Sequence, residues 1–296
     1  MSTANVPLAC DAGTAKPWFG AAAAALLKDR WAVLGLFALL LLALMALFAP
    51  GLFPGDPLSS VGPALLKPGA NGQFPLGTDT LGRDVLAGVA HGARVSLSIG
   101  ILATLFSVVL GVSVGVIAGY AGGVMDEVLS RITELFQTTP SFLLAIVIVS
   151  LAGPSVGMIV LAIGLGNFPT FARLARAEFR QLRHADFVVA AHSQGYGNAR
   201  IVFQEILPNT LPPVIVTATV QTASAILTES GLSFLGLGDP NAVSWGSMIG
   251  NGREMLQSAW YLTAIPGGMI ILAILAFNML GDGLNEAFNP RLRKSP

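Results

Sequence analysis

Charged side chains are scarce in this sequence. Only 11% of its 296 residues are Asp, Glu, Lys or Arg, whereas 53% are hydrophobic. A soluble chain of this length could not bury so large an apolar fraction, and soluble proteins average about 25% charged residues. The composition therefore excludes a soluble globular protein and predicts an integral membrane protein in contact with the lipid bilayer. We expect no nucleic-acid partner, and the formal net charge of zero says nothing on this point.

Cysteine and the residue patterns of enzymes are also missing. Cys10 is the only cysteine, which excludes an intrachain disulfide and a cysteine-based metal cluster. The sequence has no His-Glu-x-x-His zinc motif and no Gly-x-Ser-x-Gly nucleophile elbow. No lysine follows a glycine, so the phosphate-binding pattern Gly-x-x-x-x-Gly-Lys is absent as well. We expect no cofactor, no metal and no catalytic residue, which argues against an intramembrane enzyme and against ATP hydrolysis by this chain.

Long uncharged runs are what the sequence does contain. A bilayer core about 30 Å thick is crossed by roughly 20 apolar residues in a helix. The runs predict an all-α polytopic membrane protein with six transmembrane helices, in which every backbone polar group is paired internally. The predicted spans are residues 31–49, 95–118, the two halves of 135–172 on either side of 153–155, 211–235 and 255–281. We expect the first span to be a retained anchor that ends at Pro50, because no cleavage site of the signal-peptide type precedes that proline.

Basic residues collect on one side of these spans. With the amino terminus inside, twelve of the sixteen lysines and arginines fall on the inner side, and basic residues favour cytoplasmic loops. Both termini are therefore predicted to be cytoplasmic. The resulting segments are a cytoplasmic stretch 1–30, the anchor 31–49, an external Gly/Pro-rich cap 50–94, a transmembrane domain 95–283 with a cytoplasmic loop 173–210, and a basic tail 284–296.

The predicted cap contains the run PLGTDTLGRD at residues 75–84, whose Gly and Pro indicate turns. Its charged residues Asp79, Arg83 and Asp84 have two open interpretations. They contact a delivered ligand or a docking protein, or they pair locally on a solvated loop, where ion pairs contribute little.

Glycines recur every four residues in the second predicted span, at Gly111, Gly115 and Gly119. This spacing places small side chains on one helical face. We expect a neighbouring helix to approach closely there, as small residues allow in membranes.

Two acidic residues lie in or near apolar runs, where a carboxylate is costly and faces a polar interior or a partner. Glu229 is the stronger candidate for the translocation path, and Glu134 is the weaker one. The helix of Glu229 also carries Gln221, Ser224 and Thr228 at spacings of three and four, so these three share a face. The alternative, that Glu229 is hydrated at the outer interface, stays open.

The inner loop between the fourth and fifth spans is long. Four arginines between 173 and 183 lie three and four residues apart, as on one face of a helix that extends the fourth span inward. A helix is predicted over 187–194, then a break at Gly195 and Gly197, then a second piece over 199–207 before Pro208 restarts the path into the membrane. Long loops in compact folds are usually functional.

This loop carries the residues of a family resemblance. Ala190-Ala191, Gly195 and Glu205-Ile206-Leu207-Pro208, with three and nine residues between the groups, resemble the Glu-Ala-Ala loop of type I ABC importer permeases. The resemblance covers nearly all of the chain from Phe74 to Arg293 and is to the C-type permease of dipeptide, oligopeptide and nickel importers. Its other motifs are PLGTDTLGRD (75–84), GARVSL (92–97), AGYAGG (118–123), FARLAR (171–176), SGLSFLGLG (230–238), SWG (244–246) and LAFNMLGDG (275–283).

The resemblance implies the type I ABC transporter permease fold in a bacterial cytoplasmic membrane. It implies four kinds of partner: a B-type permease, two ATP-binding subunits, an external or periplasmic solute-binding protein, and lipid. The loop would dock into a groove of an ATPase, with Gly195 and Pro208 shaping it. Close approach would be permitted by Ala190 and Ala191, and Ile206 with Leu207 would seat the loop on the membrane helices.

Two positions depart from the family pattern. Val189 stands where a glutamate is usual, and Glu205 stands where peptide permeases often have histidine. We expect these departures to affect the choice of ATPase rather than docking itself. The alternative function is a stand-alone secondary transporter or channel, which would need intramembrane ionisable pairs and often repeated halves.

Overall fold

The computed structural model describes residue 20 and residues 24–288. Cys10, most of the amino-terminal segment and the basic residues of the tail lie outside the described residues. Within the described part, no strand occurs, and five helices are long and apolar enough to cross a bilayer, or six with a bent pair counted as one span. The predicted all-α, six-helix class is confirmed.

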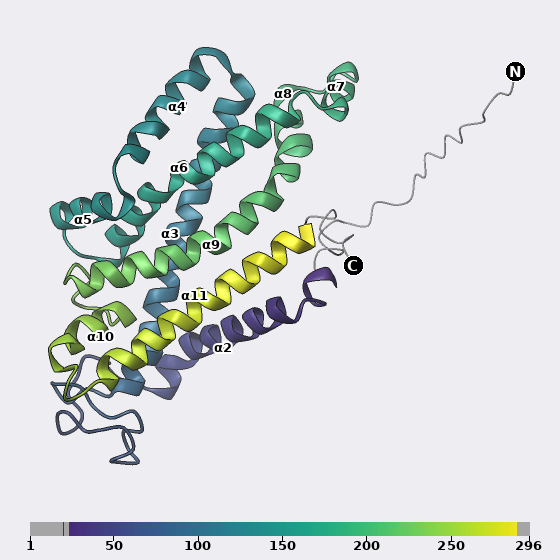
Figure 1. Ribbon diagram of the computed structural model, residues 1–296. Helices are drawn as coiled ribbons and strands as arrows, with labels where there is room; N and C mark the ends of the chain where they lie inside the picture. The colour runs from purple at the N-terminus through teal and green to yellow at the C-terminus, as the bar shows by residue number, and fades with distance from the viewer. Residues whose placement is uncertain (1–19, 21–23, 289–296) are drawn as a thin grey trace, which may run out of the picture.

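The long helices lie side by side across one layer in the order α6, α9, α11 and α2, and α3 crosses behind them to contact α6, α9 and α2 (Figure 1). Residues 53–84 and α10 form one end of the molecule. The opposite end carries α7, α8, the start of α2 and the end of α11. The elements are α2 (Arg30–Leu52), α3 (Val85–Ala121), α4 (Gly123–Thr138), α5 (Ser141–Ala152), α6 (Val156–Leu182), α7 (Asp186–Ser193), α8 (Asn198–Arg200), the π-helix η1 (Ile201–Ile206), α9 (Leu207–Phe234), α10 (Trp245–Gly252), the 3₁₀ turn η2 (Arg253–Met255) and α11 (Tyr261–Phe288).

At three prolines, the helix boundaries in the structure differ from those predicted from the sequence. Pro50 does not end the first helix but lies in its last turn. Pro140 breaks the predicted third span, because the residue before a proline avoids helical angles, and α4 and α5 meet there at 85°.

The third proline, Pro208, does not begin a new helix that returns the chain to the membrane, since one helical segment runs from Asn198 to Phe234. The ring of Pro208 follows π turns in which Leu207 N–H bonds to the carbonyl of Val202, five residues back. The wider turn accommodates a ring that would clash with a carbonyl in a regular α-helix.

Two further boundaries differ from the prediction. The second span begins ten residues earlier than expected, because Asp84 caps α3 through the N–H of Leu86. The last span begins at Tyr261 rather than at residue 255, and the short α10 precedes it. Ser244 caps α10 in a reciprocal capping box with Ser247.

The glycine strip on α3 lies against α6, as predicted. A Cβ on Gly111 would lie 2.5 Å from the carbonyl oxygen of Phe168, and one on Gly119 would lie 2.9 Å from that of Arg176. A Cβ on Gly115 would overlap the carbonyl oxygen of Ala172. The backbones of α3 and α6 therefore touch because these positions have no side chain.

We expect Gly115→Leu to separate α3 from α6 and to destabilise the protein by about 1–3 kcal/mol or more, the usual cost of overpacking. Thermal unfolding of the purified protein in detergent measures the change. Gly157→Leu is the matched control, because nothing lies within 4 Å of a Cβ built there and its φ is ordinary. Equal melting temperatures for the two variants would contradict the close contact.

Candidate functional site

The loop between α6 and α9 is a compact projection with its own apolar core. On α7, Val188 and Ala191 are buried, and they pack against Phe179 of α6 and against Ile201 and Ile206 of η1. The partly buried side chains around this cluster are Val116, Tyr120, Leu182, Tyr196 and Leu207. The core fixes α7 to the carboxyl-terminal end of α6 and to the start of the helix that continues as α9.

Gly195 ends α7 in a left-handed conformation, with φ +80°. The N–H of Tyr196 donates to the carbonyl of Ala191 at 3.1 Å, and the N–H of Gly195 donates to that of His192 at 2.9 Å. This pair of bonds is a Schellman motif, which satisfies the last carbonyls of a helix and favours glycine at the left-handed position. No atom lies within 4 Å of a Cβ built on Gly195, so within this chain the glycine is needed for its conformation rather than for space.

The face of α7 opposite its buried side is open and partly apolar. Val189, Ala190 and Ser193 lie there, and Val189 is 55% exposed. Two aromatic side chains of the loop are also exposed, Phe187 of α7 at 40% and Phe203 of η1 at 65%. Neither residue was predicted as part of the site, although aromatic side chains in a loop assigned to water are a signal of a contact surface.

The remaining predicted loop residues occupy the junction with α9. Ile206 is fully buried, and Leu207 and Pro208 are half-buried. Glu205 is also half-buried, and its backbone carbonyl accepts a hydrogen bond from the Asn209 side chain at 2.6 Å.

Arginines connect the carboxyl-terminal half of α6 to its neighbours. The predicted helical extension of the fourth span is present, because α6 continues to Leu182, and its inward direction stays a prediction. Arg176 forms a two-point ion pair with Asp126 of α4, in which the Nη2 to Oδ2 distance is 2.9 Å. Arg183 donates to the carbonyl of Gly119 at the end of α3. These contacts fix the base of the projection to α3 and α4.

The polar side chains of α9 separate into two groups. Gln221, Ser224 and Thr228 lie on an accessible face, with Ser224 exposed and the other two half-buried. Exposed Val220 and Leu227 accompany them. A face that mixes hydroxyl, amide and apolar groups at membrane depth suits contact with a second subunit or with a polar path better than contact with lipid alone.

Glu229 is not on that face but is enclosed between α9, α3 and α10, with 0% exposure. Its carboxylate accepts hydrogen bonds from Ser233 at 2.7 Å, Ser96 at 3.1 Å and Ser230 at 3.4 Å. The Ser96 oxygen in turn accepts the N–H of Trp245, the first residue of α10, at 3.2 Å. Such burial is inconsistent with hydration at the outer interface. Glu134, by contrast, is exposed and pairs with Arg131 at 3.0 Å.

Comparisons with known proteins agree with this geometry. Residues 111–294 match the family described as binding-protein-dependent transport system inner membrane component, and residues 17–68 match the N-terminal transmembrane domain of oligopeptide transport permease C. The fold is similar to that of a solved structure titled as inward-facing conformations of the MetNI methionine ABC transporter, with a TM-score of 0.56, 17% identity, and coverage of 68% of this chain and 96% of that one.

Curated relatives are similar over almost the whole chain. The dipeptide transport system permease protein DppC of Alkalihalophilus pseudofirmus is 40% identical over 267 residues, which cover 90% of this chain and 88% of the relative. The di/tripeptide transport system permease protein DppC of Pseudomonas aeruginosa is 38% identical over 273 residues and covers 90% of each chain.

Fold and sequence together define the class: this is the permease subunit of an ABC importer, a multi-pass inner membrane protein rather than an enzyme. ATP hydrolysis in such importers belongs to a separate subunit, and the alternative of a stand-alone transporter or channel does not hold. Within this class, the chain belongs to the family of binding-protein-dependent transport system inner membrane components.

Proposed function

We propose that this chain is the C-type permease of a peptide importer. It forms the membrane path with a B-type permease, receives its solute from an external binding protein, and is driven by two ATP-binding subunits. The observation that carries the proposal is the α7 projection, whose exposed apolar face belongs to a chain without a phosphate-binding loop of its own. An element fixed by a core of its own can transmit the closure of an ATPase to the membrane helices.

The ATPase contact is assigned to the open face of α7. Ala190 lies on this face, Gly195 sets the direction in which the chain leaves it, and buried Ala191 and Ile206 fasten it to η1. Glu205, Leu207 and Pro208 form the connection to α9. Exposed Val189 lies on the open face, at the position where we expect the preference for a particular ATPase to be set.

The sidedness follows from the same assignment. The end of the molecule that carries α7 also carries the start of α2 and the end of α11 (Figure 1). If α7 contacts an ATPase, this end and both chain termini are cytoplasmic, in agreement with the distribution of basic residues. Residues 53–84 and α10 are then external.

The solute path is assigned to the accessible face of α9 with Gln221, Ser224 and Thr228. Glu229 supports this face from behind, because its carboxylate holds α9 to α3 through Ser96. The substrate class rests on relatives whose names specify dipeptides and di/tripeptides.

Uptake of a labelled dipeptide into proteoliposomes tests the function. The full set of two permeases, ATPases and binding protein should transport the dipeptide only when ATP is supplied on the side of the membrane where the ATPases lie. Omission of the ATPases should abolish uptake. Transport by this chain alone, independent of ATP, would overturn the proposal, whereas ATP-dependent uptake of another solute would overturn only the peptide assignment.

A further inference from the structure

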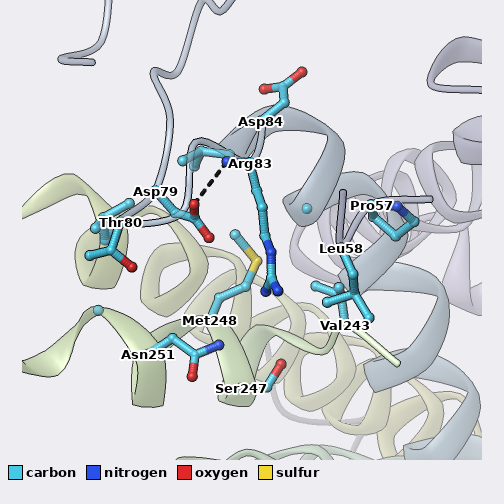
Figure 2. Close-up of a pocket in the computed structure, with 14 residues that line it drawn as sticks. Pro57, Leu58, Asp79, Thr80, Arg83, Asp84, Val243, Ser247, Met248 and Asn251 are labelled. Carbon is cyan, nitrogen blue, oxygen red and sulfur yellow. Dashed lines mark hydrogen bonds between the residues drawn. The ribbon is translucent and has the colours of Figure 1, made fainter. Parts of the chain in front are cut away.

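A pocket opens at the end of the molecule that carries α10. Residues of the loop before α3 form one wall, and residues of α10 form the other (Figure 2). The side chain of Arg83 extends from the loop toward Met248 and Ser247 of α10, with Val243 and Leu58 beside it (Figure 2). A cation therefore points into a cavity that the proposed path does not use.

The loop that carries Arg83 is held in place by its own hydrogen bonds. Asp79 Oδ1 accepts the N–H of Leu81 and that of Arg83, each at 2.8 Å, and the N–H of Asp79 donates to the carbonyl of Arg83 at 2.9 Å. Gly82 adopts φ +74°, and a Cβ there would overlap the carbonyl oxygen of Gly62. Only glycine fits this turn, so the backbone beneath Arg83 is fixed before any ligand binds.

A second contact fixes the loop to the membrane domain. The hydroxyl of Tyr261, a buried side chain at the start of α11, donates to the carbonyl of Thr78 at 2.9 Å. The position of Arg83 relative to α10 and α11 is therefore determined by the fold rather than by the flexibility of a surface loop.

Arg83 has no partner for its charge among the described residues. Its Nε is buried and makes no hydrogen bond. The neighbouring carboxylates are used elsewhere, since Asp79 binds the loop backbone and Asp84 caps α3 through Leu86 N–H at 2.9 Å. A buried guanidinium nitrogen without an acceptor costs free energy of folding, so Arg83 does not serve stability in this state.

We propose that this pocket is a docking site for a carboxylate side chain of the external solute-binding protein. A guanidinium is the side chain whose planar fork matches a carboxylate at two points. The apolar wall of Leu58, Val243 and Met248 reduces competition from water, which strengthens such a pair relative to one on an open surface.

The position of the pocket selects the binding protein as occupant. The family to which the chain belongs is binding-protein-dependent, so a protein must dock at the external end. The pocket lies between the cap loop and α10, whereas the path assigned to the solute follows Gln221 and Ser224 on the accessible face of α9. The inference rests on the proposed function, because it requires the end with α10 to be external.

Charge reversal at Arg83 tests the site in the intact importer reconstituted in nanodiscs. We expect Arg83→Glu to weaken binding of the purified binding protein at least about tenfold, Arg83→Met to weaken it nearly as much, and Arg83→Lys to weaken it less. Lys67→Glu is the matched control, since it makes the same charge change on an exposed residue of the same cap outside the pocket, and its affinity should stay within about twofold.

Three further readouts make the outcome decisive. Arg83→Met should not lower the melting temperature, because it removes an unpaired charge; a large drop that parallels the loss of binding would overturn the site in favour of a structural role. Affinity should fall for solute-free and solute-loaded binding protein alike, and a loss confined to the loaded form would instead identify a carboxylate of the solute as the occupant. Among variants of the binding protein with single surface carboxylates changed to lysine, one should restore binding to Arg83→Glu.

The wild-type importer separates the two levels of inference. If it binds its solute-binding protein and Arg83→Glu binds equally well, the pocket is not the docking site and the proposed function stands. If the wild type shows neither binding nor stimulation of ATP hydrolysis by the binding protein, the proposed function fails, and this inference fails with it.

Discussion

Replacement of Gly195 by tryptophan should abolish ATP-driven uptake while the chain still inserts into the membrane. A Cβ built on Gly195 has no atom within 4 Å apart from its chain neighbours, so we expect the large side chain to extend toward the ATPase that we assign to this face. The left-handed φ of +80° adds a strain of about 1–2 kcal/mol for a residue with a Cβ. We expect the affinity for the ATPase to fall at least about tenfold, equivalent to about 1.4 kcal/mol of binding free energy, and copurification of the ATPase to fall with it.

Asparagine at the same position is the matched control, because it tolerates the left-handed conformation and is small. Gly195→Asn should retain most of the uptake and the copurifying ATPase. Full activity of Gly195→Trp would contradict the docking assignment. Equal loss in both variants would show that the size of the tryptophan side chain is not what limits the function, and would contradict the need for clearance at this position.

The second large effect is expected at Glu229. Glu229→Ala removes the acceptor of the Ser96 and Ser233 hydroxyls and leaves a cavity between α9, α3 and α10. Each buried hydroxyl left without an acceptor costs about 1–3 kcal/mol, so we expect a loss of about 2–5 kcal/mol in stability together with the cavity. Thermal unfolding of the purified importer measures this loss, and dipeptide uptake measures its consequence for transport.

Two variants separate support of the path from packing. Glu229→Gln keeps one acceptor oxygen and nearly the same volume, so it should recover most of the stability. Ser230→Ala is the control with a small effect, because the Ser230 hydroxyl also donates to the Ile226 carbonyl at 2.8 Å and lies 3.4 Å from Glu229. Unchanged solute affinity and transport rate in Glu229→Ala would reduce Glu229 to a packing residue.

Hydropathy located most of the spanning helices because lipid imposes a simple requirement on length and charge. It did not reveal the bend before Pro140, since residues 135–152 are uncharged on both sides of it and the restriction acts on the backbone of Thr139. It also missed α10, a helix of 8 residues that is too short to register as a span. Pro208 was misinterpreted because a π turn is invisible in a pattern of residue types.

The proposed functional positions were accessible to sequence analysis to different degrees. The position of α7 in the sequence could be predicted because its motif is local, with Ala191 and Gly195 four residues apart. The environment of Glu229 was not predicted. The neighbouring Ser230 and Ser233 form a local pattern, but Ser96 comes from a helix 133 positions earlier in the chain. The pocket around Arg83 depends in the same way on the meeting of residues 79–84 with α10.

The uninterrupted helical path from Asn198 to Phe234 has a consequence for insertions and deletions. Its 37 residues measure about 55 Å along the axis, longer than the roughly 30 Å of hydrocarbon, so one element joins both ends of the molecule. Each residue added or removed within it would rotate everything beyond by about 100°. Changes of length are therefore least tolerated here and best tolerated in the exposed turn around Gly69 and Gly72, where a shift in register moves no helix.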